Sequence, residues 1–240
     1  MAENIVNEVY EEITYRGLKF KVRTAHGTDK RLVRGVLLQK DYSLEGIELK
    51  TIHTVIDIGA HVGSFSMITS KYVKQVIAFE PDPEGYRLCL ENVATNNRNN
   101  ITVVNKAIGE TTQKLKFYLG LTSGRNTLCN TEFTKTQKII DVDCIGINDL
   151  FTQYKIIQPI LLKMDIEGAE YTILNKISDE NLKKIKILVL EAHQYADKTW
   201  SYFTIIKLLE DKGFKLSKIY PAIVTKNILG VTIKAVRDDK

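Results

Sequence analysis

The stretch TVIDIGAHVGSF at residues 54–65 decides the fold. It opens with a short apolar run, and a run without alternation is typical of a strand that is covered on both faces, as in parallel sheets. Asp57 lies near the end of this run, and Gly59 and Gly63 follow it. In open α/β sheets, ligands bind at such turns between a strand and the next helix. We therefore expect this turn to form part of a binding site.

Further apolar runs repeat the pattern along the chain, at residues 75–80, 101–105, 160–165 and 185–191. Helical segments lie between them, at residues 83–97, 169–177 and 201–213. Pro83 suits the first turn of the first helix, whose predicted buried face carries Tyr86, Leu90 and Val93. The last helix is expected to bury one face and to end at Gly213. Strands that alternate with helices predict a doubly wound α/β domain with a mostly parallel sheet.

Other segments break this alternation. Residues 114–120 and 138–145 are expected to form strands around a polar loop, which predicts an inserted antiparallel hairpin. The tail after Gly213 offers two more strands, which we interpret as a terminal hairpin. Residues 1–50 contain one alternating strand and a short helix, and we interpret them as an N-terminal decoration packed on a main domain of residues 51–240.

Composition excludes several classes of protein. The 240 residues are 44% hydrophobic and 26% charged, and the formal net charge of +5 is not gathered into a dense basic run. Three cysteines, Cys89, Cys129 and Cys144, form no CxxC pair, so neither a zinc ribbon nor a disulfide framework is predicted. The N-terminus is polar and no apolar run has membrane-spanning length, so we expect a soluble protein of the cytoplasm.

The glycine turn does not match the common nucleotide-binding patterns. It lacks the third glycine of GxGxxG, and the chain contains no GxxxxGK[ST] motif. An aspartate that points into the turn would repel phosphate and favour a cationic ligand. Glu80 ends the next apolar run, where an acid accepts hydrogen bonds from a ribose diol. S-adenosylmethionine carries a ribose and positive charges and has no phosphate, so it fits both acids.

At this point the sequence resembles the FkbM-type S-adenosylmethionine-dependent methyltransferases. The motifs that carry the resemblance are VIDIGAHVGSFS, VIAFEPDPEGYRLCLENVATNN, VVNKAIGE and LLKMDIEGAEYTIL, within residues 54–195. The resemblance implies a class I methyltransferase fold with seven strands, the last antiparallel, and methyl transfer to an oxygen of a sugar or natural product. It places Asp57, Gly59 and Gly63 at the methionine end, Glu80 at the ribose and Ala107 near the adenine. His61 departs from the asparagine that relatives often have. The predicted cofactor site comprises Asp57, Gly59, His61, Gly63, Ser64, Glu80, Pro81, Ala107 and Asp165.

Catalytic candidates follow two later strands. Lys163, Asp165 and Glu167 alternate along one segment, as do Glu191 and His193 along another, so neighbouring strands would bring the five to one rim. His193 is the predicted general base, because the unperturbed pKa of histidine, about 6.5, suits proton removal near neutrality. We expect Glu191 to orient His193 or to bind substrate. Lys163 is expected either to polarise a substrate oxygen or to neutralise the neighbouring acids.

The acids and the histidine also raise the question of a metal. Such ligands suit magnesium or manganese, but their spacing matches no metal-binding loop, so the predicted site contains no metal and a divalent cation stays the lesser alternative. Arg125, in the polar loop, is equally consistent with a cover over the acceptor site and with a plain hairpin connection.

Two other functions stay open. Residues 65–97, which follow the glycine turn, also resemble archaeal-type tRNA guanine methyltransferases. However, DIEGAE stands where many base methyltransferases have an Asn/Asp-Pro-Pro-aromatic motif, and no basic stripe is present. We therefore expect a small-molecule or saccharide acceptor and consider nucleic acid an unlikely partner. The third reading is a binding module that retains the cofactor and has lost catalysis.

Overall fold

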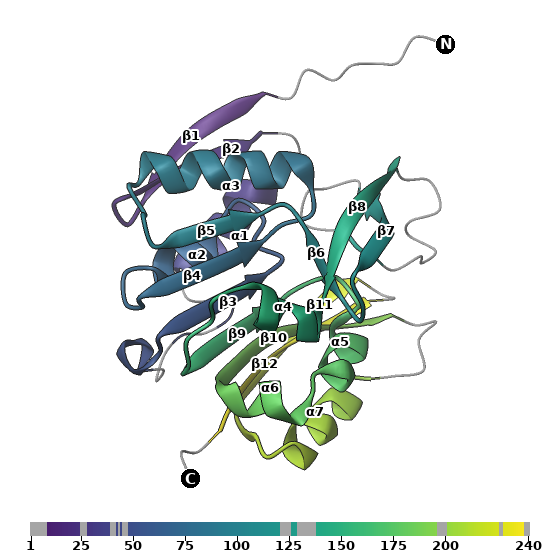
Figure 1. Cartoon of the computed structure of the whole chain (residues 1–240). Helices are drawn as coiled ribbons and strands as arrows, with labels where there is room; N and C mark the ends of the chain where they lie inside the picture. Colours follow the sequence, from purple (N-terminus) through teal and green to yellow (C-terminus); the bar gives the residue numbers. More distant parts are fainter. Residues whose placement is uncertain are drawn as a thin grey trace.

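A seven-stranded sheet forms the centre of the protein (Figure 1). The computed structural model describes residues 9–24, 28–38, 42, 44, 48–120, 126–128, 138–195, 201–225 and 228–237. The strand order is β11-β12-β10-β9-β3-β4-β5. The strands are β3 (Thr54–Ile58), β4 (Gln75–Phe79), β5 (Ile101–Val104), β9 (Ile160–Met164), β10 (Ile185–Tyr195), β11 (Lys215–Thr225) and β12 (Ile228–Val236).

The sheet confirms the predicted fold class. Strands β5, β4, β3, β9 and β10 pair in parallel, whereas β12 runs antiparallel between β10 and β11. The predicted terminal hairpin is therefore the β11–β12 pair. Strand β10 continues past the predicted end of its apolar run: its pairing with β9 stops at Leu190, and beyond that point it pairs only with β12. Glu191 and His193 consequently project past the end of β9.

Two layers of helices cover the sheet, each with its own core. One face carries α4 (Ile147–Gln153), α5 (Glu170–Lys176), α6 (Asp179–Lys184) and α7 (Tyr202–Asp211). The other face carries α1 (Thr28–Leu37), α2 (Ser64–Thr69) and α3 (Pro83–Thr95). Neighbouring residues of each central strand belong to different cores, as Val55 and Ile56 of β3 do. This is the physical reason for apolar runs without alternation, since both faces of these strands are buried.

The N-terminal segment is built into the second of these cores. It forms a hairpin of β1 (Tyr10–Tyr15) and β2 (Leu18–Arg23), followed by α1 and, later, a single turn at Leu49–Thr51. Leu18, Phe20 and Val22 are buried together with residues of β3 and β4. The sequence predicted β2 and the helix but missed β1. The boundary at residue 50 remains a prediction.

The inserted segment forms a small sheet of three strands. The predicted antiparallel pair is confirmed as β7 (Gln113–Leu119) with β8 (Lys138–Gly146), and β6 (Ala107–Gly109) adds to β8 in parallel. The part of the connecting loop that is described, residues 126–128, returns to β7 through Thr127. Arg125 lies outside the described residues.

The predicted buried face of α3 is correct only in part, since Val93 packs partly against the second core. Gly85, Leu88, Cys89 and Asn92 are the buried residues, and Leu90 is exposed. The true face follows helical spacing equally well, but it includes a glycine and an asparagine, which hydropathy alone does not select. The face of α7 is confirmed, with Ile205 and Leu209 buried. Helices α4 and α6 were not predicted.

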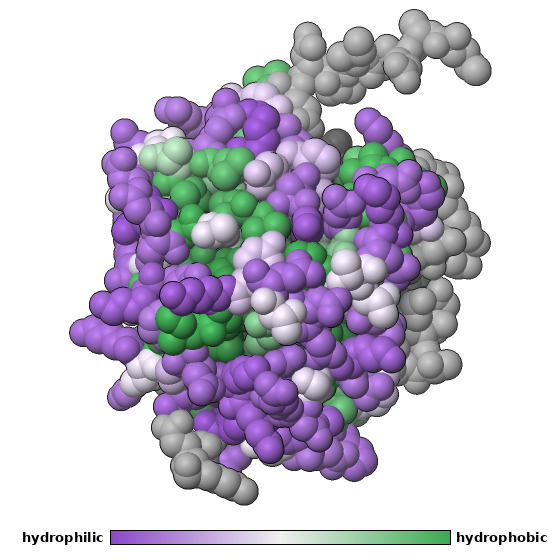
Figure 2. Space-filling model, in the orientation of Figure 1, coloured by the Kyte–Doolittle hydropathy of each residue, from purple (hydrophilic) through white to green (hydrophobic). Residues whose placement is uncertain are grey.

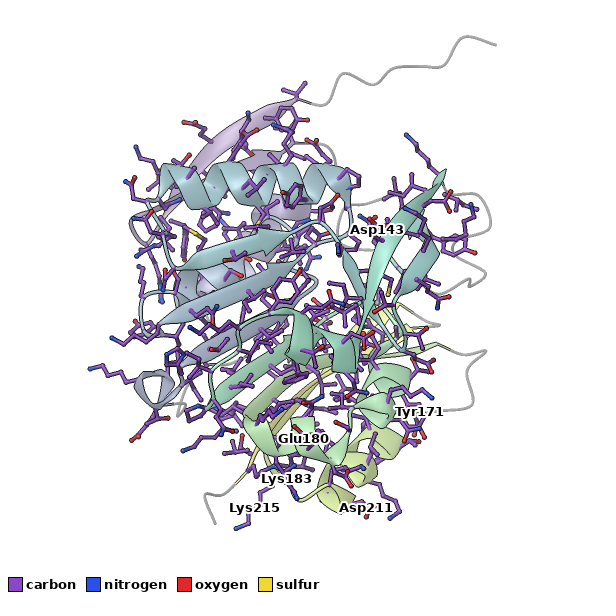
Figure 3. All side chains as sticks on the ribbon, viewed as in Figure 1. Asp143, Tyr171, Glu180, Lys183, Asp211 and Lys215 are labelled. Carbon is purple, nitrogen blue, oxygen red and sulfur yellow. The ribbon has the colours of Figure 1, made fainter. Side chains whose placement is uncertain are left out.

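The surface is mixed in charge. Figure 2 shows hydrophilic residues around the visible face and hydrophobic ones in its middle, over the sheet. Figure 3 labels acidic and basic side chains at the lower end of the view, namely Glu180 and Lys183 of α6, Asp211 of α7 and Lys215 of β11. No helix among the described residues is long and apolar enough to cross a bilayer.

Shortening Leu162 tests the central packing. This side chain is fully buried in β9, between β3 and β10, so Leu162→Ala should lower the free energy of unfolding by about 2–5 kcal/mol through a cavity and lost burial. The matched control is Leu90→Ala on the exposed side of α3, which should change it by no more than about 0.5 kcal/mol. Urea titration measures both. Equal losses in the two variants would contradict this account of the core.

Candidate functional site

The glycine turn lies at the carboxyl end of β3 and leads into α2. Gly59 and Gly63 have φ values of 80° and 88°, and His61 between them has a φ of 55°. The backbone N–H groups of Gly59 and Ala60 both donate to the carbonyl of Phe79 at the end of β4. A Cβ on Gly59 would lie 1.9 Å from the carbonyl oxygen of Asp165, so this glycine is also required by the close approach of the β9–α5 turn.

A buried ion pair between Asp57 and Lys163 supports the glycine turn from within the sheet. Asp57 has no exposed surface; its Oδ2 accepts a hydrogen bond from Ser66 at 2.7 Å, and its Oδ1 lies 3.1 Å from Nζ of Lys163. Lys163 also donates to the carbonyls of Gly59, at 2.6 Å, and Ile58, at 3.3 Å. Burial alone would lower the pKa of Lys163, but the negative charge of Asp57 raises it, so the ammonium stays charged.

This arrangement changes how two predicted residues are understood. Lys163 was expected to polarise substrate or to neutralise Asp165 and Glu167, and its ion-pair partner is instead Asp57. Asp57 was expected to act as a counter-charge for the cofactor. Gly63 occupies the cap position of α2, and Asp57 makes no cap bond. Both side chains therefore hold the glycine turn, and a direct role for either in binding or catalysis stays a prediction.

Glu80 lies beside the turn, at the end of β4. Its Oε2 accepts from the backbone N–H of His61 at 2.6 Å, and its Oε1 from that of Asp82 at 2.9 Å. Burial, with the neighbouring charge of Asp82, raises the pKa of Glu80 from 4.5 to about 7. A carboxylate at this position, already aligned by two N–H donors, can accept further bonds from a diol. Pro81 follows it and is half-buried.

His61 faces the N-terminal segment. Its Nε2 lies 3.1 Å from Oδ1 of Asp29 and 3.0 Å from Nη2 of Arg23. Arg23 is itself buried and pairs with Asp29 at 2.9 Å and with Asp82 at 3.0 Å. The Nδ1 atom of His61 is buried and has no hydrogen-bond partner among the described residues. Sequence analysis included His61 in the predicted cofactor site, and it missed the contact with Arg23.

The other predicted cofactor residues lie in two different sheets or next to them. Ser64 is buried at the first position of α2. Ala107 is buried in β6, where it pairs with Cys144 of β8. Asp165 follows β9, and its backbone N–H donates to the carbonyl of Ile58 at 3.1 Å. The structure thus brings Asp165 against the glycine turn, whereas Ala107 lies in the small inserted sheet.

His193 is the centre of a cluster of acids on β10 and the β9–α5 turn. Its Nδ1 lies 3.0 Å from Oε1 of Glu170, and its Nε2 lies 3.5 Å from Glu167 and 3.6 Å from Glu191. Burial would lower the pKa of His193, but these carboxylates raise it well above 6.5. Burial also raises the pKa of Glu167, to about 8, against the opposing effect of His193. The predicted rim is therefore present, with Lys163 turned away toward Asp57.

Glu170 was missed by sequence analysis, although it is the second Glu of the DIEGAE motif. It is fully buried at the start of α5 and accepts from the backbone N–H groups of Gly168, at 3.1 Å, and Ile166, at 3.3 Å. Since those bonds fix its carboxylate, Glu170 fixes the orientation of the His193 ring in turn. The sequence feature that could have identified Glu170 is an acid in the first turn of a helix, next to the end of a buried strand.

Asp165, Glu170 and His193 could also hold a metal ion, because one ligand atom of each lies within 4.8 Å of the others. Each of them already has a protein partner: Asp165 accepts from Tyr42, and Glu170 pairs with His193. The donor set therefore fits a divalent cation in chemistry, and its internal hydrogen bonds satisfy it without one.

Tyr42 was also missed. It is buried, has a φ of 61°, and donates a short hydrogen bond from its hydroxyl to Oδ2 of Asp165. On the far side of the rim, Thr127 of the inserted segment donates to the backbone carbonyl of Glu167 at 2.6 Å. The N-terminal segment, through Tyr42, and the inserted segment, through Thr127, thus both contact the β9–α5 turn.

Comparisons with known proteins agree with this geometry. The model of the family described as the methyltransferase FkbM domain matches residues 57–216. Methyltransferase 1 of Beauveria bassiana is 26% identical over 184 residues, which cover 68% of this chain and 72% of the relative. The 31-O-demethyl-FK506 methyltransferase FkbM of Streptomyces tacrolimicus is 23% identical, over 78% of this chain and 82% of its own.

Among solved structures, the tRNA m1G37 methyltransferase of M. jannaschii has a TM-score of 0.50 at 12% identity, covering 98% of this chain and 58% of that one. A likeness at this identity shows the fold. The prediction that nucleic acid is an unlikely partner is not borne out by these comparisons, because a structural neighbour acts on tRNA.

Glu80 should make stability depend on pH. Because its pKa is higher in the folded protein than in the unfolded chain, folding takes up a proton between pH 4.5 and about 7, and the free energy of unfolding falls as pH rises through this window. The shift corresponds to a loss on the order of 3 kcal/mol above pH 7. Urea titrations at several pH values should show that this component of the slope is absent in Glu80→Gln. An unchanged slope in the variant would contradict the raised pKa.

The histidine cluster can be titrated directly. The imidazole of His193 should stay protonated well above pH 6.5, and Glu191→Gln should lower its pKa by removing one nearby negative charge. Ring resonances followed by NMR against pH measure the pKa of His193 in both proteins. A His193 that titrates near 6.5, or a pKa that rises in the variant, would show that the acids do not control it.

Proposed function

The chain belongs to the family of the methyltransferase FkbM domain, and from this premise we propose that it transfers the methyl group of S-adenosylmethionine to a hydroxyl oxygen of a small-molecule or saccharide acceptor. The observation that carries the proposal is the His193–Glu170 pair, which lies past the end of β9 and near Asp165, the residue that contacts the glycine turn. A histidine oriented by a buried carboxylate is the arrangement that removes a proton from a hydroxyl nucleophile.

The donor site is formed by the turns after β3, β4 and β9. Glu80 offers its carboxylate to the ribose diol, and Asp165 offers a negative charge to the methionine portion. The buried Nδ1 of His61, without a hydrogen-bond partner among the described residues, fits a site that gains a polar ligand. When bound, S-adenosylmethionine supplies an activated methyl group on positively charged sulfur, and the acids along this edge suit that charge.

Proton removal involves the cluster as a unit. Three carboxylates raise the pKa of His193, so the neutral imidazole that accepts a proton is a minor form near neutrality. Turnover should therefore increase with pH over the range in which the cluster releases its proton. Glu191 and Glu167, next to Nε2, stabilise the imidazolium that forms once the acceptor hydroxyl has given up its proton.

The acceptor class rests on two supports. The Streptomyces relative is named for 31-O-demethyl-FK506, which favours an oxygen acceptor. The inserted segment contacts the rim through Thr127, and segments of this kind vary between proteins of one fold and set their acceptors. We further propose that the protein acts in the cytoplasm, where the buried thiols of Cys89 and Cys144 would stay reduced.

Replacing His193 separates binding from catalysis. His193→Ala should leave the affinity for S-adenosylmethionine within about threefold of the parent and should slow turnover by roughly 10²–10⁴-fold, because only proton removal is lost. Calorimetry measures the affinity, and mass spectrometry of acceptor pools detects methylated product. His53→Ala is the matched control, since His53 lies at the opposite end of β3 and should affect neither.

The same experiment decides between functions. Absence of S-adenosylmethionine binding by the parent protein would refute the proposal altogether. Binding without product in any pool would indicate a binding module that has lost catalysis. Methylated RNA as the product, with affinity that falls steeply as salt rises, would indicate the tRNA-type function instead. Unchanged turnover in His193→Ala would show that another group is the base.

A further inference from the structure

Tyr42 lies outside the residues that the family model matches, yet its side chain reaches the centre of the site. The hydroxyl donates to Oδ2 of Asp165, which is 123 residues away in the sequence. The ring packs edge-on against Phe65 of α2, with centroids 5.5 Å apart, and Nζ of Lys163 lies 5.2 Å from its centroid. One aromatic side chain thus contacts the glycine-turn helix, the buried ion pair and the β9–α5 turn.

The backbone of Tyr42 is in the left-handed region, which a bulky residue rarely adopts. Two other non-glycine residues at this edge, His61 and Glu167, share that conformation. Such strain persists only where the surroundings hold it, and it gathers at functional sites. The conformation of Tyr42 is therefore part of the construction of the site.

Tyr42 controls the orientation of the Asp165 carboxylate. The backbone of Asp165 is fixed on both sides, because its N–H donates to Ile58 and its carbonyl packs against Gly59. The carboxylate can still rotate, and the hydrogen bond from Tyr42 fixes Oδ2 and thereby directs Oδ1. Burial and the nearby acids raise the pKa of Tyr42 well above 10, so its hydroxyl remains a donor at every physiological pH.

The N-terminal segment does not depend on this hydrogen bond for its docking. Leu18, Phe20 and Val22 bury it against the sheet, and Arg23 ties it to Asp82 through a buried ion pair. Removal of the Tyr42 hydroxyl should therefore leave the segment in place, so that an effect on function can be separated from an effect on the fold.

We propose that Tyr42 is a positioning residue of the methyl-donor site, whose hydroxyl holds the Asp165 carboxylate in the orientation that receives the methionine portion of S-adenosylmethionine. This rests on the proposed function. The N-terminal segment is then part of the donor site, and residues 57–216 alone do not complete it.

Tyr42→Phe removes the hydroxyl and keeps the ring. Its affinity for S-adenosylmethionine should fall by about tenfold, the effect of losing one hydrogen bond to a charged group. The matched control is Tyr10→Phe, since Tyr10 of the same segment donates to Glu84 of α3, away from the site. The control should bind within about twofold of the parent. Calorimetry measures affinity, and urea titration checks that both variants are folded.

A double-mutant cycle shows whether Tyr42 acts through Asp165. In an Asp165→Ala background, Tyr42→Phe should cost no further affinity, because the group that the hydroxyl positions is gone. A purely structural role would give additive losses.

The outcomes separate this proposal from the proposed function. A parent protein that does not bind S-adenosylmethionine refutes the proposed function and this inference with it. A parent that binds, with Tyr42→Phe binding equally well, overturns the role of Tyr42 and leaves the function intact. Additive losses in the cycle, or a Tyr42→Phe protein that fails to fold, also overturn it, because the hydroxyl would then stabilise the fold rather than orient Asp165.

Discussion

The buried ion pair between Asp57 and Lys163 is the interaction on which the site depends. Two adjacent parallel strands each place one charge at the same level, since Asp57 of β3 and Lys163 of β9 are register partners. Neither charge can be removed alone without leaving the other buried and unpaired, at a cost of about 3–5 kcal/mol. The ammonium of Lys163 also donates hydrogen bonds to the carbonyls of Ile58 and Gly59. The same charge that neutralises Asp57 therefore holds the glycine turn.

The glycine turn is fixed from above by a second set of charges. Arg23 of the N-terminal segment joins Asp29, Asp82 and His61, and the backbone of His61 donates to Glu80. The turn is therefore held between an ion pair inside the sheet and an ion-pair cluster outside it. Arg23 and Asp29 of this second set come from a segment that sequence analysis treated as a decoration, and this is why the sequence of the glycine turn alone does not describe the site.

Sequence patterns predicted those parts of the structure that local rules determine. The parallel strands were found because burial on both faces produces continuous apolar runs, and the acids at their ends were found because strand ends meet at one edge. The buried face of α3 was predicted only in part, because Gly85 and Asn92 are buried through packing and hydrogen bonds rather than hydropathy. Tyr42 could not be found, because its partner Asp165 is distant in sequence and no periodicity encodes such a contact.

The buried carboxylates along this edge suit a positively charged ligand, but their ionised forms lower the stability of the folded protein. Folding buries Glu80 and Glu167, and the pKa values of both rise into the neutral range, which means that their ionised forms weaken the folded state. An isolated fold would be more stable without these charges. A ligand that brings positive charge to the same edge would oppose this effect, because it favours the ionised carboxylates that burial disfavours. The electrostatics of the edge therefore couple donor binding to stability, with the Asp57–Lys163 pair as the fixed base on which that coupling acts.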